Sequence, residues 1–346
     1  MKSWHPLLPA LSVGHPVPAR RSHLDSGWDL GALLEQADEQ GVAYAVTRAL
    51  SEGPWRSMLT RTESDGVRVV QEAVVRRDMI WEQTASSALT ALPGGVRPIL
   101  LKGAGARTLL YDHPGDRTCV DLDLMLPKGR EALSRASLES AGWEDEVGRR
   151  SSSWHVHGMS IRTPLATMSM EIHRTLDNAE RGRIDYEALA PCCREMQIMG
   201  RPSLVPDPAA QLLVGATHAL RHGMDVPLKS LVDVHRAVTL CSREQLFVPL
   251  LDRSPGAAAT LGVMLRLCHA LFGTDVPPVW RRDLAAPVLS APLLFLSLDH
   301  RVPGYARAPF NRSRYLRRLW FQSLLTGSPA VMARVGWAWA GRRLGR

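Results

Sequence analysis

A seven-residue alternation of apolar and acidic side chains fits a β-strand better than any other local structure. Residues 120–126 read Val-Asp-Leu-Asp-Leu-Met-Leu, and successive side chains of a strand point to opposite faces. Asp121 and Asp123 then share one face, and the other, apolar face packs. Two neighbouring carboxylates repel each other, so we expect a counterion, and a divalent cation suits their oxygens best. An exposed edge strand, or a pair neutralised by Arg117, are the alternatives.

A glycine-rich turn precedes this strand. Residues 96–101 are typical of a short buried strand, which leads through Lys102-Gly103-Ala104-Gly105 directly into a helix over 103–110. Glycine lets a backbone approach a ligand closely, and the first helical turn offers N–H groups to an anion. The turn is therefore a candidate phosphate site, although it matches neither the P-loop nor the dinucleotide-binding pattern. Lysine is rare here, at four of 42 basic residues, and a flexible point charge suits a phosphate.

A third acidic residue lies on a later strand. Within residues 167–175, Met168, Met170 and Ile172 alternate with Ser169, Glu171 and His173. Glu171 and His173 therefore share a face. If this strand lies beside the first, Glu171 completes a carboxylate triad able to hold two Mg²⁺ ions for in-line attack at phosphorus. The alternative is that Glu171 is a solvated sheet residue.

Length and composition indicate a globular protein with several regions. The 346 residues exceed the size at which one core stops growing, and 45% apolar with 22% charged residues is close to the globular average. We expect an α+β protein in which a small mixed sheet with flanking helices is embedded between helical regions. The expected regions are a loose leader at 1–27, an N-terminal helical region at 28–93, the core at 94–200, a C-terminal helical region at 201–300 and a basic tail at 301–346.

Hydrophobic periodicity places the individual elements. Gly41 is expected to break the first helical stretch, Pro93-Gly94-Gly95 to end the second, and Asp207 to cap a later helix with Pro208 at its first position. Helices are predicted over 28–46, 66–92, 103–110, 129–141, 209–222, 228–240 and 256–272, and strands over 96–101, 120–126, 155–162 and 167–175.

Several classes of protein are disfavoured. The longest apolar stretch, 284–298, is interrupted by Pro287 and Pro292 and is too short to cross a bilayer, so no transmembrane segment is predicted. The N-terminus has no apolar stretch typical of a secretory signal, which favours a cytoplasmic location. The five cysteines have no Cys-x-x-Cys spacing, which argues against a disulfide framework and a structural zinc site.

Positive charge is concentrated at the C-terminus. The net charge is +8, but residues 301–346 hold ten arginines and no acid, so the other 300 residues carry 8 minus 10, or −2. Tryptophan and leucine are interleaved with these arginines and indicate a basic amphipathic surface. It could meet an anionic partner such as lipid, nucleic acid or an acidic peptide. Helices that pack their apolar side onto the body are the favoured alternative.

The core segment resembles the uncharacterised nucleotidyltransferases of the DNA polymerase beta superfamily. The resemblance is carried by the sequence around the glycine turn, by a Leu-Leu-Tyr helix end, by an arginine, and by the Asp-x-Asp and acidic strands. These are residues 99–104, 109–111, Arg117, 121–124 and 171–174. The similarity covers about residues 28–240 and is strongest over 96–126. Lys102-Gly103-Ala104 stands where most of the superfamily has Gly-Ser, a feature of this subfamily.

This resemblance implies a fold, an activity and a set of roles. The fold is a minimal nucleotidyltransferase sheet, and the activity moves a nucleoside monophosphate from an NTP to a hydroxyl or phosphate acceptor and releases pyrophosphate. Asp121, Asp123 and Glu171 would bind two Mg²⁺ ions, with Mn²⁺ as the alternative, and Glu171 would orient or deprotonate the acceptor. The nucleotide would be bound by Lys102, Gly103, Ala104 and Arg117, with Gly103 and the helix start at the β and γ phosphates.

Four histidines are candidates for an acceptor pocket. His218 and His222 are one helical turn apart without the glutamate of the zinc-protease motif, and a structural role is favoured for them. His155 and His173 lie on predicted strands. The acceptor, a small molecule, peptide or saccharide, is not specified by the sequence. Two rival functions remain at this stage: transfer of a sugar or other group from a nucleotide-activated donor at the same Asp-x-Asp site, and non-catalytic binding of a nucleotide or anionic partner.

Overall fold

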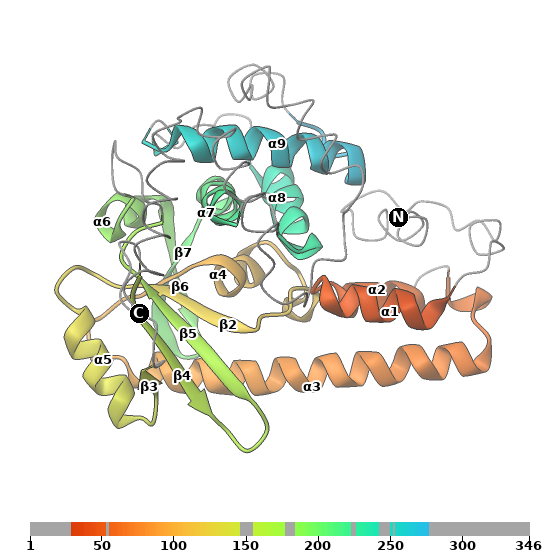
Figure 1. Ribbon diagram of the computed structural model, residues 1–346, viewed down its shortest axis with the longest axis horizontal. Helices are drawn as coiled ribbons and strands as arrows, with labels where there is room; N and C mark the ends of the chain where they lie inside the picture. Colours follow the sequence, from red (N-terminus) through yellow and green to blue (C-terminus); the bar gives the residue numbers. More distant parts are fainter. Residues whose placement is uncertain are drawn as a thin grey trace, which may run out of the picture.

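The computed structural model describes residues 29–52, 55–145, 155–176, 184–222, 226–241, 250–251 and 253–276. One mixed sheet lies at the centre of this part of the chain, with helices on both faces (Figure 1). The chain is an α+β protein, as predicted. The leader, the basic tail and residues 277–300 of the C-terminal helical region lie outside the described residues.

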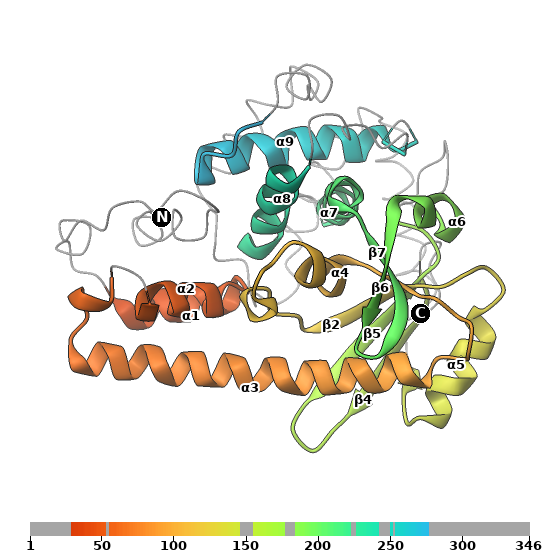
Figure 2. The ribbon, with the colours of Figure 1, turned by 180° about the vertical axis from the view of Figure 1, so that it is seen from behind.

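Three helices form the N-terminal part. Helix α1 (Leu30–Glu39) and α2 (Ala43–Glu52) are separated at Gly41, which adopts a left-handed φ of +68°, so the predicted break is confirmed. After the short 3-10 turn η3 (Arg56–Met58), α3 (Arg61–Ala91) runs the length of the molecule (Figure 2). Its start is fixed by a capping box in which the side chains of Thr60 and Glu63 each bond the other's backbone N–H.

Seven strands form the sheet in the order β3-β4-β5-β2-β1-β7-β6. They are β1 (Ile99–Leu100), β2 (Asp121–Met125), β3 (Glu144–Asp145), β4 (His155–Arg162), β5 (Thr167–His173), β6 (Cys193–Ile198) and β7 (Arg201–Pro206). Strand β2 pairs antiparallel with β1 and parallel with β5. The predicted strand pair at 155–175 is observed, whereas the hairpin of β6 and β7 was not predicted.

The remaining short elements connect these strands. They are α4 (Lys102–Leu109), η4 (Pro114–Asp116), α5 (Glu131–Ser140), α6 (Tyr186–Leu189) and η5 (Ala190–Cys192). Three helices follow the sheet: α7 (Pro208–Arg221), α8 (Leu228–Leu240) and α9 (Pro255–Phe272). The predicted cap of α7 is confirmed, because the Asp207 carboxylate accepts a hydrogen bond from the Ala210 N–H at 2.8 Å.

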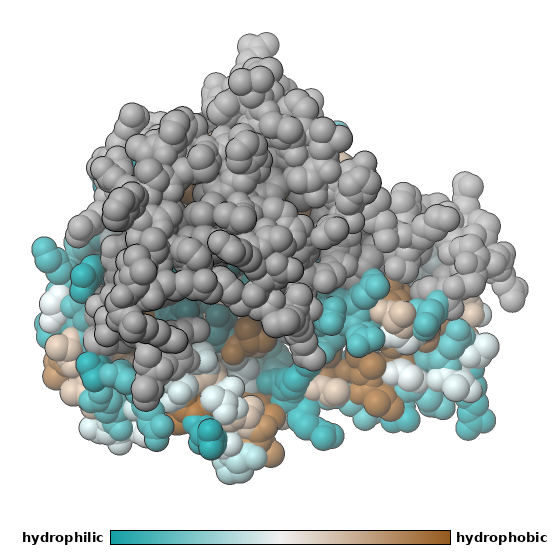
Figure 3. Space-filling view, in the orientation of Figure 1, coloured by the Kyte–Doolittle hydropathy of each residue, from teal (hydrophilic) through white to brown (hydrophobic). Residues whose placement is uncertain are grey.

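Two apolar clusters lie on the two sides of the sheet. The C-terminal half of α3 and α5 pack on the side that carries Leu122, Leu124 and Met170. Helices α1, α2 and α7 to α9 belong to the other cluster, together with Ile99 and Met125. Asp123 alternates with Leu122 and Leu124, so its side chain lies on the side covered by α7. On the face seen in Figure 3, hydrophilic and hydrophobic residues are interspersed along the lower edge, where α3 and α5 lie.

Within the described ranges, no helix combines the length and apolar character that crossing a bilayer requires. All five cysteines are free thiols, in agreement with the predicted lack of a disulfide framework.

Candidate functional site

Two adjacent parallel strands carry the acidic residues. Asp123 of β2 is directly opposite Glu171 of β5, and Asp121 is opposite Ser169. The predicted carboxylate triad requires β5 to lie beside β2, and the two strands are neighbours in the sheet. Glu171 is therefore a close neighbour of the Asp-x-Asp pair, although their segments are far apart in the sequence.

Asp123 lies at the centre of a compact polar cluster. Its Oδ1 accepts a hydrogen bond from the Lys102 ammonium at 2.5 Å and lies 2.6 Å from Nε2 of His173. Oε2 of Glu171 lies 3.6 Å from Lys102 Nζ and 3.5 Å from His173 Nε2. The side chains of Asp123 and His173 are 2% and 1% exposed, and those of Lys102 and Glu171 are 17% and 16% exposed.

The charges in this cluster stabilise one another. Burial disfavours an ionised Asp123, but the Lys102 charge and the His173 hydrogen bond hold the pKa of Asp123 well below its ordinary value. Burial disfavours an ammonium as well, but Asp123 and Glu171 outweigh it and raise the pKa of Lys102. Burial lowers the pKa of His173, so the neutral imidazole donates its Nε2–H to the carboxylate. The cluster therefore contains an ionised carboxylate, an ammonium and a neutral imidazole at neutral pH.

The acidic face of β2 is not open to solvent, so both faces of this strand are covered at Asp123 rather than the apolar face alone. Asp123 is buried, whereas Val120, expected on the packed face, precedes β2 and is 70% exposed. Helices α4 and α7 lie over this side of the sheet (Figure 1). Asp121 is partly buried, and burial followed by the charge of Asp123 raises the pKa of Asp121 to about 6.

The turn before α4 places Lys102 in the cluster. Lys102 has a left-handed φ of +46°, which is uncommon for a residue with a side chain. A Cβ on Gly105 would lie 2.3 Å from the Leu100 carbonyl oxygen, and one on Gly103 would lie 2.9 Å from the Cys119 sulfur. The two glycines therefore accommodate neighbouring protein atoms, rather than leaving a space for ligand beside their Cα atoms.

Arg117 does not join the carboxylates of the cluster. Its Nε donates to both carboxylate oxygens of Asp233, at 2.8 and 2.9 Å, and its Nη1 donates to the Thr118 carbonyl. Tyr111 donates to the same aspartate at 2.7 Å. The Arg117 side chain is 6% exposed, so its guanidinium is bound to neighbouring protein groups, and its nucleotide contact stays a prediction.

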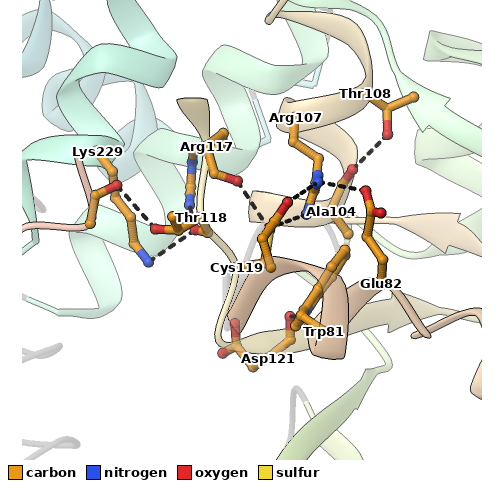
Figure 4. Close-up of polar contacts among 12 residues, drawn as sticks. Trp81, Glu82, Ala104, Arg107, Thr108, Arg117, Thr118, Cys119, Asp121 and Lys229 are labelled. Carbon is orange, nitrogen blue, oxygen red and sulfur yellow. Dashed lines mark hydrogen bonds and ion pairs between the residues drawn. The ribbon is translucent and has the colours of Figure 1, made fainter. Parts of the chain in front are cut away.

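Two further charged groups near the site were not identified from the sequence. Arg107 of α4 binds the carboxylates of Asp78 and Glu82 on α3 and lies over the Trp81 ring. Lys229 of α8 extends toward the segment that leads into β2 (Figure 4). The rarity of lysine in this chain was a signal that could have identified Lys229.

The histidines predicted for an acceptor pocket separate into three groups. His173 belongs to the cluster. The rings of His218 and His222 are in tilted contact at the end of α7, with centroids 4.4 Å apart. Burial followed by the charge of Lys102 lowers the pKa of His218 well below its ordinary value. His155 pairs with His173 through the backbones of β4 and β5, and its side chain lies outside the described part of the chain.

The two carboxylates of the cluster suit a hard divalent cation. One ligand atom each from Asp123, Glu171 and His173 lie within 4.8 Å of one another, and carboxylate oxygens are preferred by Mg²⁺. The Lys102 ammonium touches the same carboxylates, so the structure already places a positive charge where a cation would be attracted. Asp121 lies two residues before Asp123, at the start of β2.

Comparisons with solved structures find nucleotidyltransferases at low identity. The solution structure of the antibiotic-resistance factor ANT(2'')-Ia covers 56% of this chain and 96% of its own at 17% identity, with a TM-score of 0.37. An antigenic nucleotidyltransferase-like protein from Paracoccidioides brasiliensis covers 58% and 94% at 14% identity, with a TM-score of 0.38. The STING-associated CdnE c-di-GMP synthase from Capnocytophaga granulosa covers 88% and 98% at 12% identity, with a TM-score of 0.30.

A comparison with curated proteins finds no match. The sequence model of one family matches residues 26–273, which is more than half of the chain and includes every described residue from α1 to the end of α9. The Lys102 turn, the Asp-x-Asp strand and the Glu171 strand all fall inside the match. The chain belongs to the family of uncharacterised nucleotidyltransferases.

Proposed function

We propose that this protein moves a nucleoside monophosphate from an NTP to a hydroxyl or phosphate group of an acceptor and releases pyrophosphate. The observation that supports the proposal is the meeting of Asp123, Glu171 and Lys102 at the start of α4. Such a cluster of carboxylates and an ammonium beside a helix N-terminus can bind a metal-bound polyphosphate.

The residues of the cluster receive distinct roles in this proposal. Asp121, Asp123 and Glu171 would hold Mg²⁺, or Mn²⁺ as the alternative, which when bound would neutralise phosphate charge and polarise the α-phosphorus. His173 orients Asp123 through the 2.6 Å hydrogen bond. Lys102 binds phosphate oxygens, and the first turn of α4, at Gly103 and Ala104, offers backbone N–H groups to the same anion.

The reaction would be an in-line displacement at the α-phosphorus. The acceptor oxygen forms a bond to that phosphorus while the bond to the bridging oxygen of the β-phosphate breaks, and pyrophosphate leaves with the electron pair. Glu171, which is partly exposed, takes the proton of the acceptor hydroxyl. His218 and His222 at the end of α7 are proposed to line the acceptor side, together with His173.

A transfer assay tests the proposal. The purified protein with Mg²⁺ or Mn²⁺ is given NTPs labelled at the α-phosphate and candidate small-molecule, peptide and saccharide acceptors, and both the label on the acceptor and the released pyrophosphate are measured. Asp123→Asn and Glu171→Gln should abolish both signals. Release of a nucleoside diphosphate from a nucleotide sugar would show glycosyl transfer instead, and binding without either product would show a non-catalytic protein.

A cytoplasmic location stays a prediction.

A further inference from the structure

Lys229 is held in a fixed place by three segments that are distant in the sequence. Its Nζ lies 3.5 Å from the Thr118 carbonyl oxygen, and its stem crosses Gly41 so closely that a Cβ there would lie 2.4 Å from Cδ of the lysine. The backbone N–H of Lys229 donates to the Gln40 carbonyl oxygen, and the Thr118 hydroxyl donates to that of Gly41. The loop at Gln40–Gly41, the segment before β2 and the start of α8 therefore position this amine together (Figure 4).

This position is unfavourable for a cation. Lys229 is the second residue of α8, where the helix dipole is positive. Burial, followed by the charge of Arg117, lowers the pKa of Lys229 to about 8. Among the described residues, no carboxylate lies within the 4.0 Å ion-pair distance of its ammonium, whereas Lys102, Arg107 and Arg117 each have one. The Thr118 carbonyl oxygen at 3.5 Å is an uncharged acceptor, so within the described fold this ammonium lacks a close carboxylate partner, which indicates a ligand of opposite charge.

The amine lies beside the segment that leads into the Asp-x-Asp strand. Its contact Thr118 is three residues before Asp121, the first residue of β2. Two of the four lysines of this chain therefore lie near this strand: Lys102, at the start of α4, contacts Asp123, and Lys229, at the start of α8, contacts Thr118. Arg117, the other cation considered for this role, is already bound to Asp233.

We propose that Lys229 is a second phosphate-binding residue, and that the di- or triphosphate of the nucleotide lies between Lys229 and Lys102 along the Asp121 side of β2. This inference rests on the proposed function and adds a residue that the sequence analysis did not consider. A lysine suits the position because its slim stem passes over Gly41, where the wide guanidinium of an arginine would need more space.

The test uses inorganic triphosphate, which removes any dependence on the nucleobase. Its affinity for the full-length protein is measured by calorimetry with Mg²⁺, beside that of inorganic phosphate. Lys229→Met keeps an apolar stem over Gly41 and removes the charge, and Lys229→Gln provides a second uncharged variant. The control is Lys128→Met, because Lys128 is exposed and lies outside the site.

Two results are expected together. Both Lys229 variants should bind triphosphate about tenfold or more weakly, with a smaller loss for phosphate, and without ligand they should melt at the same temperature as wild type or higher. A merely structural lysine would give a lower melting temperature and unchanged triphosphate affinity, which would overturn the proposal, as would variants that do not fold. Wild-type protein that binds no triphosphate would overturn it too. If triphosphate binding depends on Lys229 but no NTP is turned over, this proposal stands and the proposed transfer fails.

Discussion

Replacing Lys102 with methionine tests whether this lysine neutralises the buried carboxylate of Asp123. The substitution removes an ammonium 2.5 Å from Asp123 Oδ1 and 3.6 Å from Glu171 Oε2, and leaves a side chain of similar length. The backbone φ of +46° is disfavoured for both residues, so that strain cancels in the comparison. The change in stability therefore reports the loss of the charge.

The expected loss is about 3 kcal/mol. Removing one partner of a buried ion pair costs roughly 3–5 kcal/mol, because the remaining charge is left in a poorly solvated place. The Asp123 carboxylate is 2% exposed, so it cannot turn to solvent, but it keeps its hydrogen bond with His173 at 2.6 Å. That remaining contact places the expected value at the lower end of the range.

The loss should depend on pH in a defined direction. Folding lowers the pKa of Asp123 below its ordinary value of 3.8, so its contribution to stability is present above about pH 4 and is lost as the pH falls. The difference between wild type and Lys102→Met should therefore be largest near pH 7 and shrink below about pH 4. Mg²⁺ should stabilise the variant more than wild type, because it replaces the missing positive charge.

Urea denaturation of both proteins at pH 7 and at about pH 2.5, with and without Mg²⁺, gives the free energies of unfolding. Lys128→Met serves as the control because it removes an exposed lysine, and it should change stability by less than about 0.5 kcal/mol. If Lys102→Met is as stable as this control at pH 7, the ammonium does not stabilise the buried carboxylate and the charge assignment of the cluster is wrong.

Further substitutions test other contacts. Asp121→Asn should stabilise the ligand-free protein at pH 7 by on the order of 2 kcal/mol. The pKa of Asp121 in the folded protein is about 6, so wild type loses stability as the pH rises from about 4 to 6. Denaturation of both proteins at pH 4 should therefore show no such gain. Gly105→Ala should lower the free energy of unfolding by about 2 kcal/mol, because its Cβ would meet a backbone oxygen of β1 at 2.3 Å. Gly66 is in open space within α3, so Gly66→Ala should raise the free energy of unfolding by about 0.5–1 kcal/mol. Thermal melts of both variants check these values. Tyr111→Phe should cost about 1–2 kcal/mol, since the hydroxyl donates to the Asp233 carboxylate at 2.7 Å; an unchanged urea midpoint would contradict this.

Local patterns were enough to predict most of the fold. The bounds 155–162 and 228–240 agree with β4 and α8, and the Asp207 cap with Pro208 begins α7 as expected. Such patterns succeed because periodicity, caps and breaks depend on residues close in the sequence. The hairpin of β6 and β7 escaped prediction because β6 is an edge strand with one buried residue among its six, so its sequence lacks a clear apolar alternation.

The sequence by itself predicted the acidic residues and one lysine of the candidate site, and the tertiary structure decided what each one contacts. Asp123, Glu171 and Lys102 were identified from alternation, a glycine turn and the rarity of lysine. That Lys102 neutralises Asp123 and His173 donates a hydrogen bond to it, that Arg117 binds Asp233, and that Lys229 contacts Thr118 follow from strand register and helix packing. A charged side chain binds the group that long-range packing brings within hydrogen-bond distance, and no pattern of neighbouring residues encodes that distance.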